Sequence, residues 1–324
     1  MKRKNFLIVI LLTSITINVL ACKSKKETIM EIIIIKNKES VLQVDSIAHS
    51  QKKYSKPYHS IYVRGAKCQY SIWIDDILIF NFRGEKDDGG PSGDLPINNV
   101  LLKSGIHTVT ARIYPSYNEK SLDFMSEVQL NYNLREVENI KEVEQGLFIV
   151  NASDVASLSN ADKGLEGMPY FGVSRRFYAE VPFEQTGWSQ SVDLRAYAED
   201  SLKREIRLAY EKIHHLMETK ELESLRKMYL SLMDLRAVSF YLDQEEKEAE
   251  WDDISKLVTN SNYRLSPLPQ KAFLHFYAGG KLITLLDKDY NGIIRFENRQ
   301  DPRNVIILDF KFHKKKYDKE FEVI

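Results

Sequence analysis

Residues 68–82, with the sequence CQYSIWIDDILIFNF, carry the clearest fold signal of the N-terminal half. Both ends of this stretch are rich in β-branched and aromatic residues, which favour extended strands. Asp75 and Asp76 interrupt the apolar pattern in the middle. Two polar residues between two such runs are typical of a β-hairpin, although the glycine that best suits a tight primed turn is missing. We therefore expect antiparallel strands at residues 68–74 and 77–82.

Further strands are expected on both sides of this hairpin. Residues 30–35 form a continuous β-branched run that suits a buried strand, and residues 59–64 form a second run before the hairpin. Residues 106–113 alternate between apolar and polar side chains, and residues 124–132 are another candidate strand. The sequence predicts an all-β sandwich over residues 30–150.

Residues 60–133 resemble the jelly-roll sandwiches that serve as sugar-binding modules. A strand ending in Ile74-Asp75-Asp76-Ile77 is followed, after a loop, by Leu101-Leu102-Lys103-Ser104-Gly105 and the alternating strand at residues 106–113. This order is similar to the polar turn and the leucine–glycine–strand element of that fold. The resemblance implies a fold and carries no ligand residues, because the same fold serves many functions.

The apolar pattern changes after the sandwich. Residues 151–192 are expected to be a linker and a connecting strand, since their first part is small and polar. Residues 170–183 could either return to the first sheet or connect the two domains. Near Asp193 the apolar spacing becomes helical, which predicts a first helix and then a second one that starts at Thr219. Residues 243–250 are expected to be the exposed end of this second helix, before the apolar pattern resumes.

The C-terminal part is predicted to be β again. Gly279-Gly280 and Asn291-Gly292 are strong hairpin signals between short apolar runs. The expected strands are residues 273–277, 282–286, 293–296 and 305–312. Two helices followed by an antiparallel meander make an α+β domain over residues 193–324, so the whole chain is expected to be α+β. This order is similar to the cystatin-like or nuclear-transport-factor-like cone, in which a curved sheet wraps helices.

The first 21 residues have the composition of an export signal. Three basic residues lie close to the start, and a mostly apolar run follows at residues 6–17. This run is shorter than a spanning helix requires and is diluted by polar residues, although an uncleaved signal anchor stays an alternative. The segment Val19-Leu20-Ala21-Cys22 resembles the lipobox of bacterial lipoproteins. The alternative is an ordinary signal peptide that ends near a cysteine.

The lipobox resemblance implies that Cys22 is acylated and becomes the first residue of the mature protein. Several acyl chains on one residue anchor a protein stably to a membrane. Residues 22–29 would then be a short polar tether. The residue after the cysteine is not aspartate, which in such lipoproteins favours the outer over the inner membrane. We therefore expect a periplasmic or surface-facing envelope protein.

Charge and cysteine content argue against a nucleic-acid-binding protein and against a disulfide-stabilised fold. The chain has 46 basic and 46 acidic residues, and the leader contains three of the basic ones, so the mature chain is slightly acidic. This balance gives no electrostatic case for binding nucleic acid. With Cys22 acylated, Cys68 is the only other cysteine, so no intramolecular disulfide is expected.

Two acidic segments are candidate ligand sites. The loop with Asp87, Asp88 and Asp94 also contains three glycines, and such a loop can surround a cation or a sugar, or be ordinary flexible chain. The aromatic residues Trp73, Tyr70 and Tyr62 are a candidate sugar platform, although in alternating strands such residues more often face a core.

The second candidate is a calcium-like turn. Asp287, Asp289 and Asn291, followed by Gly292, match the first half of an EF-hand loop. The twelfth position is Asn298, which lacks the bidentate carboxylate that calcium requires. A plain hairpin turn is the competing interpretation, and calcium is the only cofactor that the sequence suggests.

No catalytic motif is present: the chain lacks a glycine-rich phosphate loop, a serine elbow, HExxH and CxxC. We expect a lipid-anchored, non-catalytic binding protein of the cell envelope with a protein partner. One version is an immunity lipoprotein that neutralises an antibacterial effector, in analogy to lipoproteins of type VI secretion loci. The alternatives are a carbohydrate- or surface-polymer-binding lipoprotein and a hydrolase in the C-terminal domain, since catalytic groups need not be adjacent in sequence.

The Cys22→Ser substitution tests the expected anchor. It removes the thiol that would be acylated, so the protein should no longer incorporate labelled fatty acid. It should then leave the membrane fraction and appear in the soluble fraction. Continued extraction only by detergent would indicate an uncleaved spanning segment instead.

Overall fold

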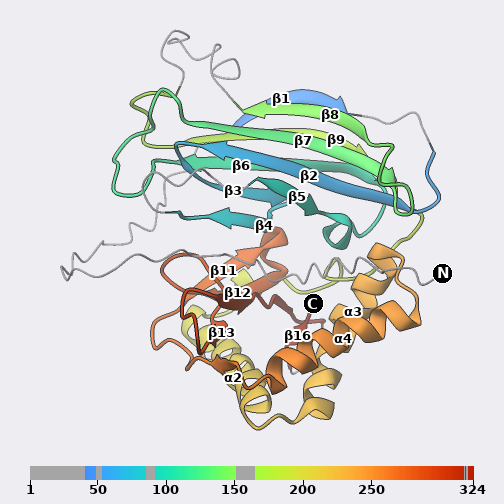
Figure 1. The fold of residues 1–324 in the computed structure, drawn as a ribbon, viewed down its shortest axis with the longest axis vertical. Coiled ribbons are helices and arrows are strands. Elements are labelled where there is room, and N and C mark those ends of the chain that lie inside the picture. The colour runs from blue at the N-terminus through green and yellow to red at the C-terminus, as the bar shows by residue number, and fades with distance from the viewer. Residues whose placement is uncertain (1–40, 49–52, 85–91, 151–164, 317, 319) are drawn as a thin grey trace. The chain divides into compact units, whose positions relative to one another are not determined.

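The computed structural model describes residues 41–48, 53–84, 92–150, 165–316, 318 and 320–324. The described chain forms two compact units that meet in sequence between Glu184 and Gln185. The predicted α+β class is confirmed, because the described part of the first unit consists of β-sheets with one short 3-10 helix (Asn98–Val100), and helices precede further strands in the second (Figure 1). The leader, Cys22, the tether and the strand expected at residues 30–35 lie outside the described residues.

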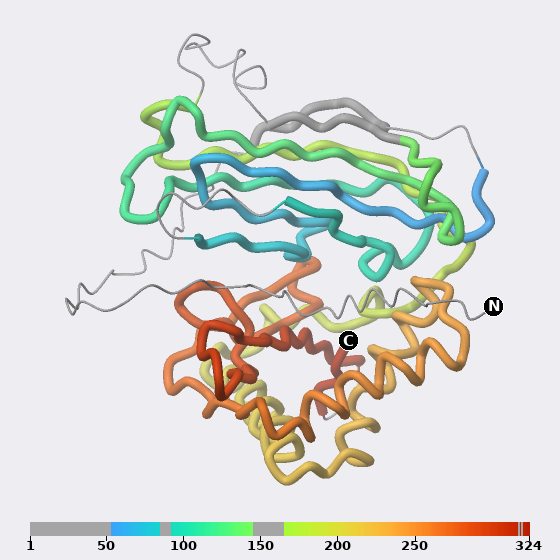
Figure 2. Tube along the Cα trace, viewed as in Figure 1, coloured from blue at the N-terminus to red at the C-terminus, as the bar shows by residue number. Residues whose placement is uncertain are grey.

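The N-terminal unit contains two sheets. The first is five-stranded in the order β1-β9-β6-β3-β4, and the second is four-stranded in the order β5-β2-β7-β8. All neighbours are antiparallel except β1 and β9, which run parallel. Figure 2 follows the chain through both sheets. The strands are β1 (Val41–Ala48), β2 (Pro57–Ala66), β3 (Gln69–Ile74), β4 (Ile77–Phe82), β5 (Gly93–Pro96), β6 (Gly105–Tyr114), β7 (Glu127–Glu136), β8 (Glu144–Val150) and β9 (Phe171–Ala179).

The core of this unit lies between the two sheets. Tyr132 of β7 packs against Phe177 of β9, with ring centroids 5.0 Å apart. Ile61 and Val63 of β2 are buried in the same layer. β2, β7 and β9 therefore each have one face in the core, which is the arrangement of a β-sandwich.

The hairpin predicted at residues 68–82 is confirmed as β3 and β4. Asp75 and Asp76 both have positive φ angles, 47° and 65°, as a primed two-residue turn requires. Aspartate tolerates this region because its side chain can form local hydrogen bonds. Oδ1 of Asp75 accepts a hydrogen bond from Thr108 N at 2.8 Å, and Oδ2 lies 2.5 Å from Nδ1 of His107. These bonds to β6 hold the turn in place without a glycine.

The structure corrects the start of one expected strand and decides between the two alternatives for another. The strand expected at residues 124–132 begins at Glu127, because Asp123 and Ser126 close a hydrogen-bonded turn before it. The connecting strand expected after residue 150 is β9, which lies between β1 and β6 in the sheet. The sandwich therefore continues through β9, past the boundary expected at residue 150.

The C-terminal unit has three long helices where two were expected: α2 (Glu199–Glu218), α3 (Leu222–Phe240) and α4 (Gln244–Thr259). The expected second helix breaks at Tyr241, which has a left-handed φ of 58°. Asp243 then starts α4 with a capping box, in which its side chain accepts from Glu246 N and Glu246 reaches back to Asp243 N. Within the described part of the chain, no helix has the length and apolar character needed to cross a membrane.

The C-terminal strands form two small sheets instead of one meander. The turn with Gly279 and Gly280 joins β11 to β12 in a hairpin, as predicted. The chain does turn back at Asn291-Gly292, where Leu286 and Gly292 form an isolated antiparallel bridge, but the turn does not continue into a hairpin, because β13 pairs with β14 in the other sheet. The sheets are β10-β13-β14 and β11-β12-β15-β16, with strands β10 (Tyr263–Leu265), β11 (Phe273–Tyr277), β12 (Leu282–Leu286), β13 (Ile294–Asn298), β14 (Val305–Leu308), β15 (Phe312–His313) and β16 (Glu322–Val323).

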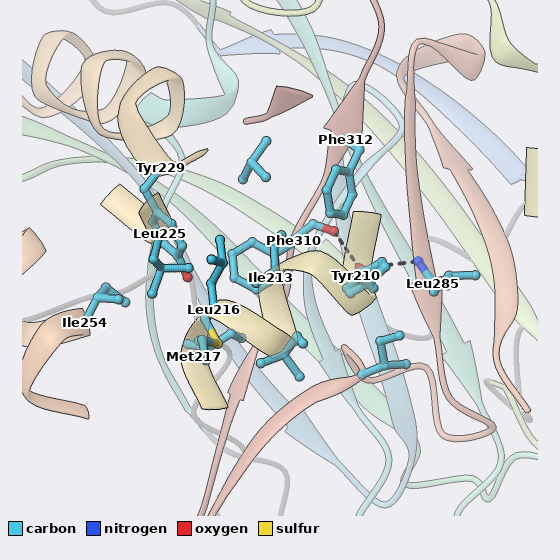
Figure 3. Packing of buried hydrophobic residues seen from close by; sticks show 14 of the residues in the cluster. Tyr210, Ile213, Leu216, Met217, Leu225, Tyr229, Ile254, Leu285, Phe310 and Phe312 are labelled. Atoms are coloured by element: carbon cyan, nitrogen blue, oxygen red, sulfur yellow. Dashed lines mark hydrogen bonds between the residues drawn. The ribbon is translucent and has the colours of Figure 1, made fainter. Parts of the chain in front are cut away.

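Tyr210 of α2 ties the helices to these strands. Its ring is fully buried and packs against Phe312, with ring centroids 5.0 Å apart (Figure 3). Its hydroxyl lies 2.8 Å from Oγ1 of Thr284 and 3.1 Å from the carbonyl of Phe310. A buried phenol with its hydroxyl satisfied adds packing without leaving an unpaired polar group.

A buried histidine makes the N-terminal unit sensitive to acid. His59 of β2 has no exposed surface; its Nδ1 lies 2.6 Å from the Tyr132 hydroxyl and its Nε2 lies 3.0 Å from the Glu180 carbonyl. Burial lowers the pKa of His59 from 6.5 to about 4, against the raising effect of the Glu180 carbonyl and with a smaller lowering contribution from His107. Between these two values only the unfolded chain binds the proton, so stability falls as the pH falls.

We expect the free energy of unfolding of this unit to drop by up to about 3 kcal/mol as the pH is lowered through this range. In a Cys22→Ser background, where Cys68 is the only cysteine, the rate at which a disulfide reagent modifies the buried Cys68 thiol in urea reports the unfolding of this unit. The His59→Gln variant should show a flatter pH dependence, because glutamine does not titrate. An equally steep profile in the variant would assign the effect to another group.

Candidate functional site

The candidate site is the outer face of the sheet β5-β2-β7-β8. Along β2, the buried residues alternate with residues that point to the opposite side of the sheet, as the two-residue period of a strand requires. The antiparallel pairing of β2 with β5 and β7 extends this outer surface across three strands. We call it the polar face, and it consists of Ser60, Tyr62, Arg64, Asp94, Gln129, Asn131 and Asn133.

Asp94 is the centre of the polar face. It lies on the edge strand β5 and is exposed. Its Oδ1 accepts a hydrogen bond from Nδ2 of Asn133 at 2.9 Å and one from the Ser60 hydroxyl at 3.3 Å. Since Ser60 belongs to β2, the strand between β5 and β7, the Asp94–Asn133 bond crosses above it. Ser60 is consequently only 2% exposed.

Two amide oxygens on the polar face have no donor. Oδ1 of Asn133 and Oδ1 of Asn131 are both shielded from solvent, and no residue in the described ranges donates a hydrogen bond to either. A buried carbonyl oxygen without a donor costs about 1–3 kcal/mol. Other buried side-chain atoms of the described chain also lack a partner, the hydroxyl of Tyr229 among them. The two amide oxygens differ in lying two residues apart on one strand beside Asp94, where a single ligand could supply both missing donors.

Aromatic and cationic side chains surround this acceptor-rich centre. Tyr62 lies directly between Asp94 and Asn131 in the strand register. Arg64 is exposed two residues further along β2. At the other end of the face, the Arg135 guanidinium lies 4.0 Å from the centre of the Tyr58 ring and donates to the carbonyls of Glu136 and Val137. The polar face thus combines planar hydrogen-bonding groups with the Tyr62 ring, and the Tyr58 ring lies beyond its end on the same side of β2.

The predicted acidic loop reaches this face through one residue. Asp94 lies on β5, at the end of that loop, whereas Asp87 and Asp88 lie outside the described residues. Tyr62 is on the polar face, but Tyr70 of the predicted aromatic platform is fully buried in the core. The three aromatic residues therefore do not form one platform.

In the calcium-like turn, the Asp287 carboxylate is bound by other groups of the protein. Oδ1 of Asp287 accepts hydrogen bonds from the backbone amides of Asp289 and Asn291, at 2.8 and 2.9 Å. Its Oδ2 forms an ion pair with Arg295. The cation beside the carboxylate is therefore a guanidinium, and the segment has the hydrogen bonds of an aspartate-closed turn. Among the described residues, no three or more histidine, cysteine, aspartate or glutamate side chains are grouped closely enough to hold a metal.

The C-terminal unit contains a serine–histidine–glutamate chain. Ser191 Oγ lies 2.7 Å from Nδ1 of His313, and Nε2 of His313 lies 3.3 Å from Oε2 of Glu322. Burial lowers the pKa of His313, although Glu322 opposes the shift. Burial would raise the pKa of Glu322, but hydrogen bonds from Lys315 and Ser231 outweigh it and leave this pKa lowered.

These three hydrogen-bonded residues have the order of a nucleophile, a base and an acid, which bears on the hydrolase alternative. A nucleophile must contact its substrate. A pocket of about 490 Å³ lies beside these three residues. Ser231 and Glu322 line it, but Ser191 and His313 do not. His313 is only 1% exposed. The contacts therefore hold β15, β16 and the segment around Ser191 together, and they do not present the serine to a substrate.

The chain matches no known protein family, no curated protein and no solved structure.

Sequence reasoning found Asp94 and missed its partners. Ser60, Asn131 and Asn133 belong to strands that were expected, or partly expected, from their apolar residues. The signal that was available is the set of polar residues at alternate positions of these strands. Their meeting point depends on which strands become neighbours, and local patterns do not contain this information.

If the polar face is kept for binding, removing an unpaired amide should stabilise the fold. The Asn131→Val variant loses no hydrogen bond to a described residue and gains a β-branched side chain, so its free energy of unfolding should rise by about 0.5–1 kcal/mol. Urea unfolding followed through the Cys68 thiol measures this change.

The matched control is Asn133→Val, which loses the hydrogen bond to Asp94 and should lower the free energy of unfolding by about 1 kcal/mol. Destabilisation of both variants to the same extent would show that the Asn131 amide has a structural role.

Proposed function

We propose that this chain is a lipid-anchored protein of the cell envelope that binds a carbohydrate or another hydroxyl-rich surface polymer through the polar face. The observation that carries the proposal is the acceptor cluster of Asp94, Asn131 and Asn133, in which two amide oxygens lack a donor. Catalysis has no part in the proposal.

The chemistry of the cluster suits hydroxyl groups. Oδ2 of Asp94 forms no hydrogen bond with a described residue, and the residue is exposed, so this oxygen is available to a ligand. The terminal torsion of an asparagine side chain is soft, so a small rotation turns its oxygen toward a bound donor. A hydroxyl group donates one hydrogen bond and accepts others. Neighbouring hydroxyls of a sugar therefore satisfy Asp94 and the amides together.

Tyr62 and Arg64 add complementary features beside this cluster. A tyrosine ring offers an apolar surface and a polar hydroxyl within one side chain. Arg64 is exposed, makes no hydrogen bond or ion pair with a described residue, and provides donors in a fixed planar arrangement. Donors and acceptors on one flat sheet fit a ligand that carries both along its length.

The lipobox resemblance supports the location. An acylated Cys22 would hold the sandwich close to the membrane surface, where envelope polysaccharides are abundant. The immunity hypothesis shares this anchor and predicts a protein partner instead. The polar composition of the face favours the carbohydrate ligand, because the centre of a protein–protein interface is usually depleted of charged residues.

The Asp94→Asn substitution tests the proposal. Full-length protein in detergent is applied to a glycan array and to purified envelope polysaccharide. Loss of the charge weakens the hydrogen bonds from ligand hydroxyls while the side-chain shape stays the same. The affinity for the bound glycan should fall about tenfold, in line with a charge-assisted hydrogen bond of about 1.5–3 kcal/mol.

Glu166→Gln is the matched control, since it removes an exposed carboxylate in the turn before β9 and should leave binding unchanged. Undiminished binding by Asp94→Asn would move the site elsewhere. If the wild-type protein binds no glycan, and cells that lack it are killed by sister cells, the immunity hypothesis is the better account.

A further inference from the structure

A second pocket lies in the C-terminal unit, between α2 and the strands that pack against this helix. It has a volume of about 480 Å³, within the range of small-molecule sites. Ala272 and Leu285 in its lining are buried, whereas Leu208 is 63% exposed. The apolar surface therefore extends from the base of the pocket to its rim.

Cationic side chains lie on the helix side of this pocket. Lys203, Arg204 and Arg207 line it, against the single carboxylate of Asp200. Lys203 and Arg204 are exposed, and neither makes an ion pair or a hydrogen bond with any residue in the described ranges. The electrostatic character of the pocket is therefore positive.

The opposite wall is held in place by two side chains of α2. Nη1 of Arg207 donates to the carbonyl of Pro269 at 2.6 Å, and Nε2 of His214 lies 3.0 Å from the carbonyl of Ser266. These two residues are seven positions apart, so they lie on the same face of the helix two turns from each other. The segment that carries the two accepting carbonyls, residues 266–269, contains Pro267 and Pro269, whose rings restrict the backbone. The pocket is preorganised.

Arg207 has a second partner, which fixes its orientation. Its Nε donates to Oε1 of Glu211 at 2.9 Å. The remaining donors of the Arg207 guanidinium have no partner among the described residues, so they are available to a ligand. Arg204 and Lys203 then provide further donors from the preceding turn of the same helix.

We propose that this pocket binds a small anionic amphiphile: a carboxylate or a phosphate joined to an apolar body. The anionic group would contact Lys203, Arg204 and Arg207, and the apolar body would cover Leu208, Ala272 and Leu285. A fatty acid and a phosphate-bearing lipid fragment share this chemistry. The inference is independent of the polar face, because the two sites lie in different units and share no residue.

Calorimetric titration of the full-length protein separates these requirements with four probes. Octyl phosphate and octanoate carry both an anionic group and an alkyl chain, octanol carries only the chain, and inorganic phosphate carries only the charge. We expect either or both of the anionic alkyl probes to bind at least tenfold more tightly than octanol and inorganic phosphate. The tighter of the two identifies the preferred headgroup.

Variants at exposed positions test the residues without risk to the fold. Lys203→Gln and Arg204→Gln should each weaken the binding of the preferred probe about three- to tenfold, whereas Lys220→Gln, an exposed lysine at the end of α2, should not change it. Leu208→Gln should weaken binding of the alkyl probes and leave that of inorganic phosphate unchanged.

Three results would overturn the proposal. Equal affinity for octanol and the anionic probes would remove the role of charge, and equal affinity for inorganic phosphate would remove the role of the apolar surface. Absence of binding by both anionic alkyl probes would exclude the site. None of these results affects glycan binding at Asp94, so failure here is distinct from failure of the proposed function.

Discussion

The side-chain alternation in the β2–β7 pair is the constraint on which the N-terminal unit and its candidate site depend. All ten residues of β2 pair with the ten of β7, from Pro57 opposite Glu136 to Ala66 opposite Glu127. Because the period is two residues, a slip of β2 by one position turns Ser60 into the core and exposes Ile61. The cost of burying such polar groups and exposing such apolar ones specifies the register. The same register brings Asp94, Ser60 and Asn133 within hydrogen-bonding distance.

Stability and binding make opposite demands on the two sides of these strands. The inner side is satisfied throughout: His59, for example, has a partner at each ring nitrogen even though it is fully buried. The outer side keeps two amide oxygens that have no donor among the described residues, which lowers the stability of the fold. Residues that violate a local rule without compensation are expected at functional sites. This contrast within single strands is the physical reason to place the function on the outer side.

In the C-terminal unit, α2 combines the same two roles. One side carries Tyr210, whose ring and hydroxyl join the helix to the strands. Another side carries Lys203 and Arg204, which are left without partners among the described residues, and Arg207, which fastens the wall of a pocket. A helix held rigidly by its buried residues positions its exposed residues equally firmly. The contacts of Ser191, His313 and Glu322 are also held firmly, but Ser191 does not line the neighbouring pocket, so the geometry of the three residues alone does not make them catalytic.

The α+β class, the hairpin at Asp75-Asp76, the start of the helical region and most C-terminal strands follow from local apolar period and turn chemistry, so they could be predicted before any contact was known. The sequence also identified Asp94. Only the tertiary structure decided where the second helix breaks, that β13 pairs with β14, and that β9 lies between β1 and β6. Each of these outcomes depends on contacts between residues far apart in the chain, or on a cap competing with helix propagation. For the same reason the partners of Asp94 and the pocket beside α2 became visible only when distant strands and helices were placed side by side.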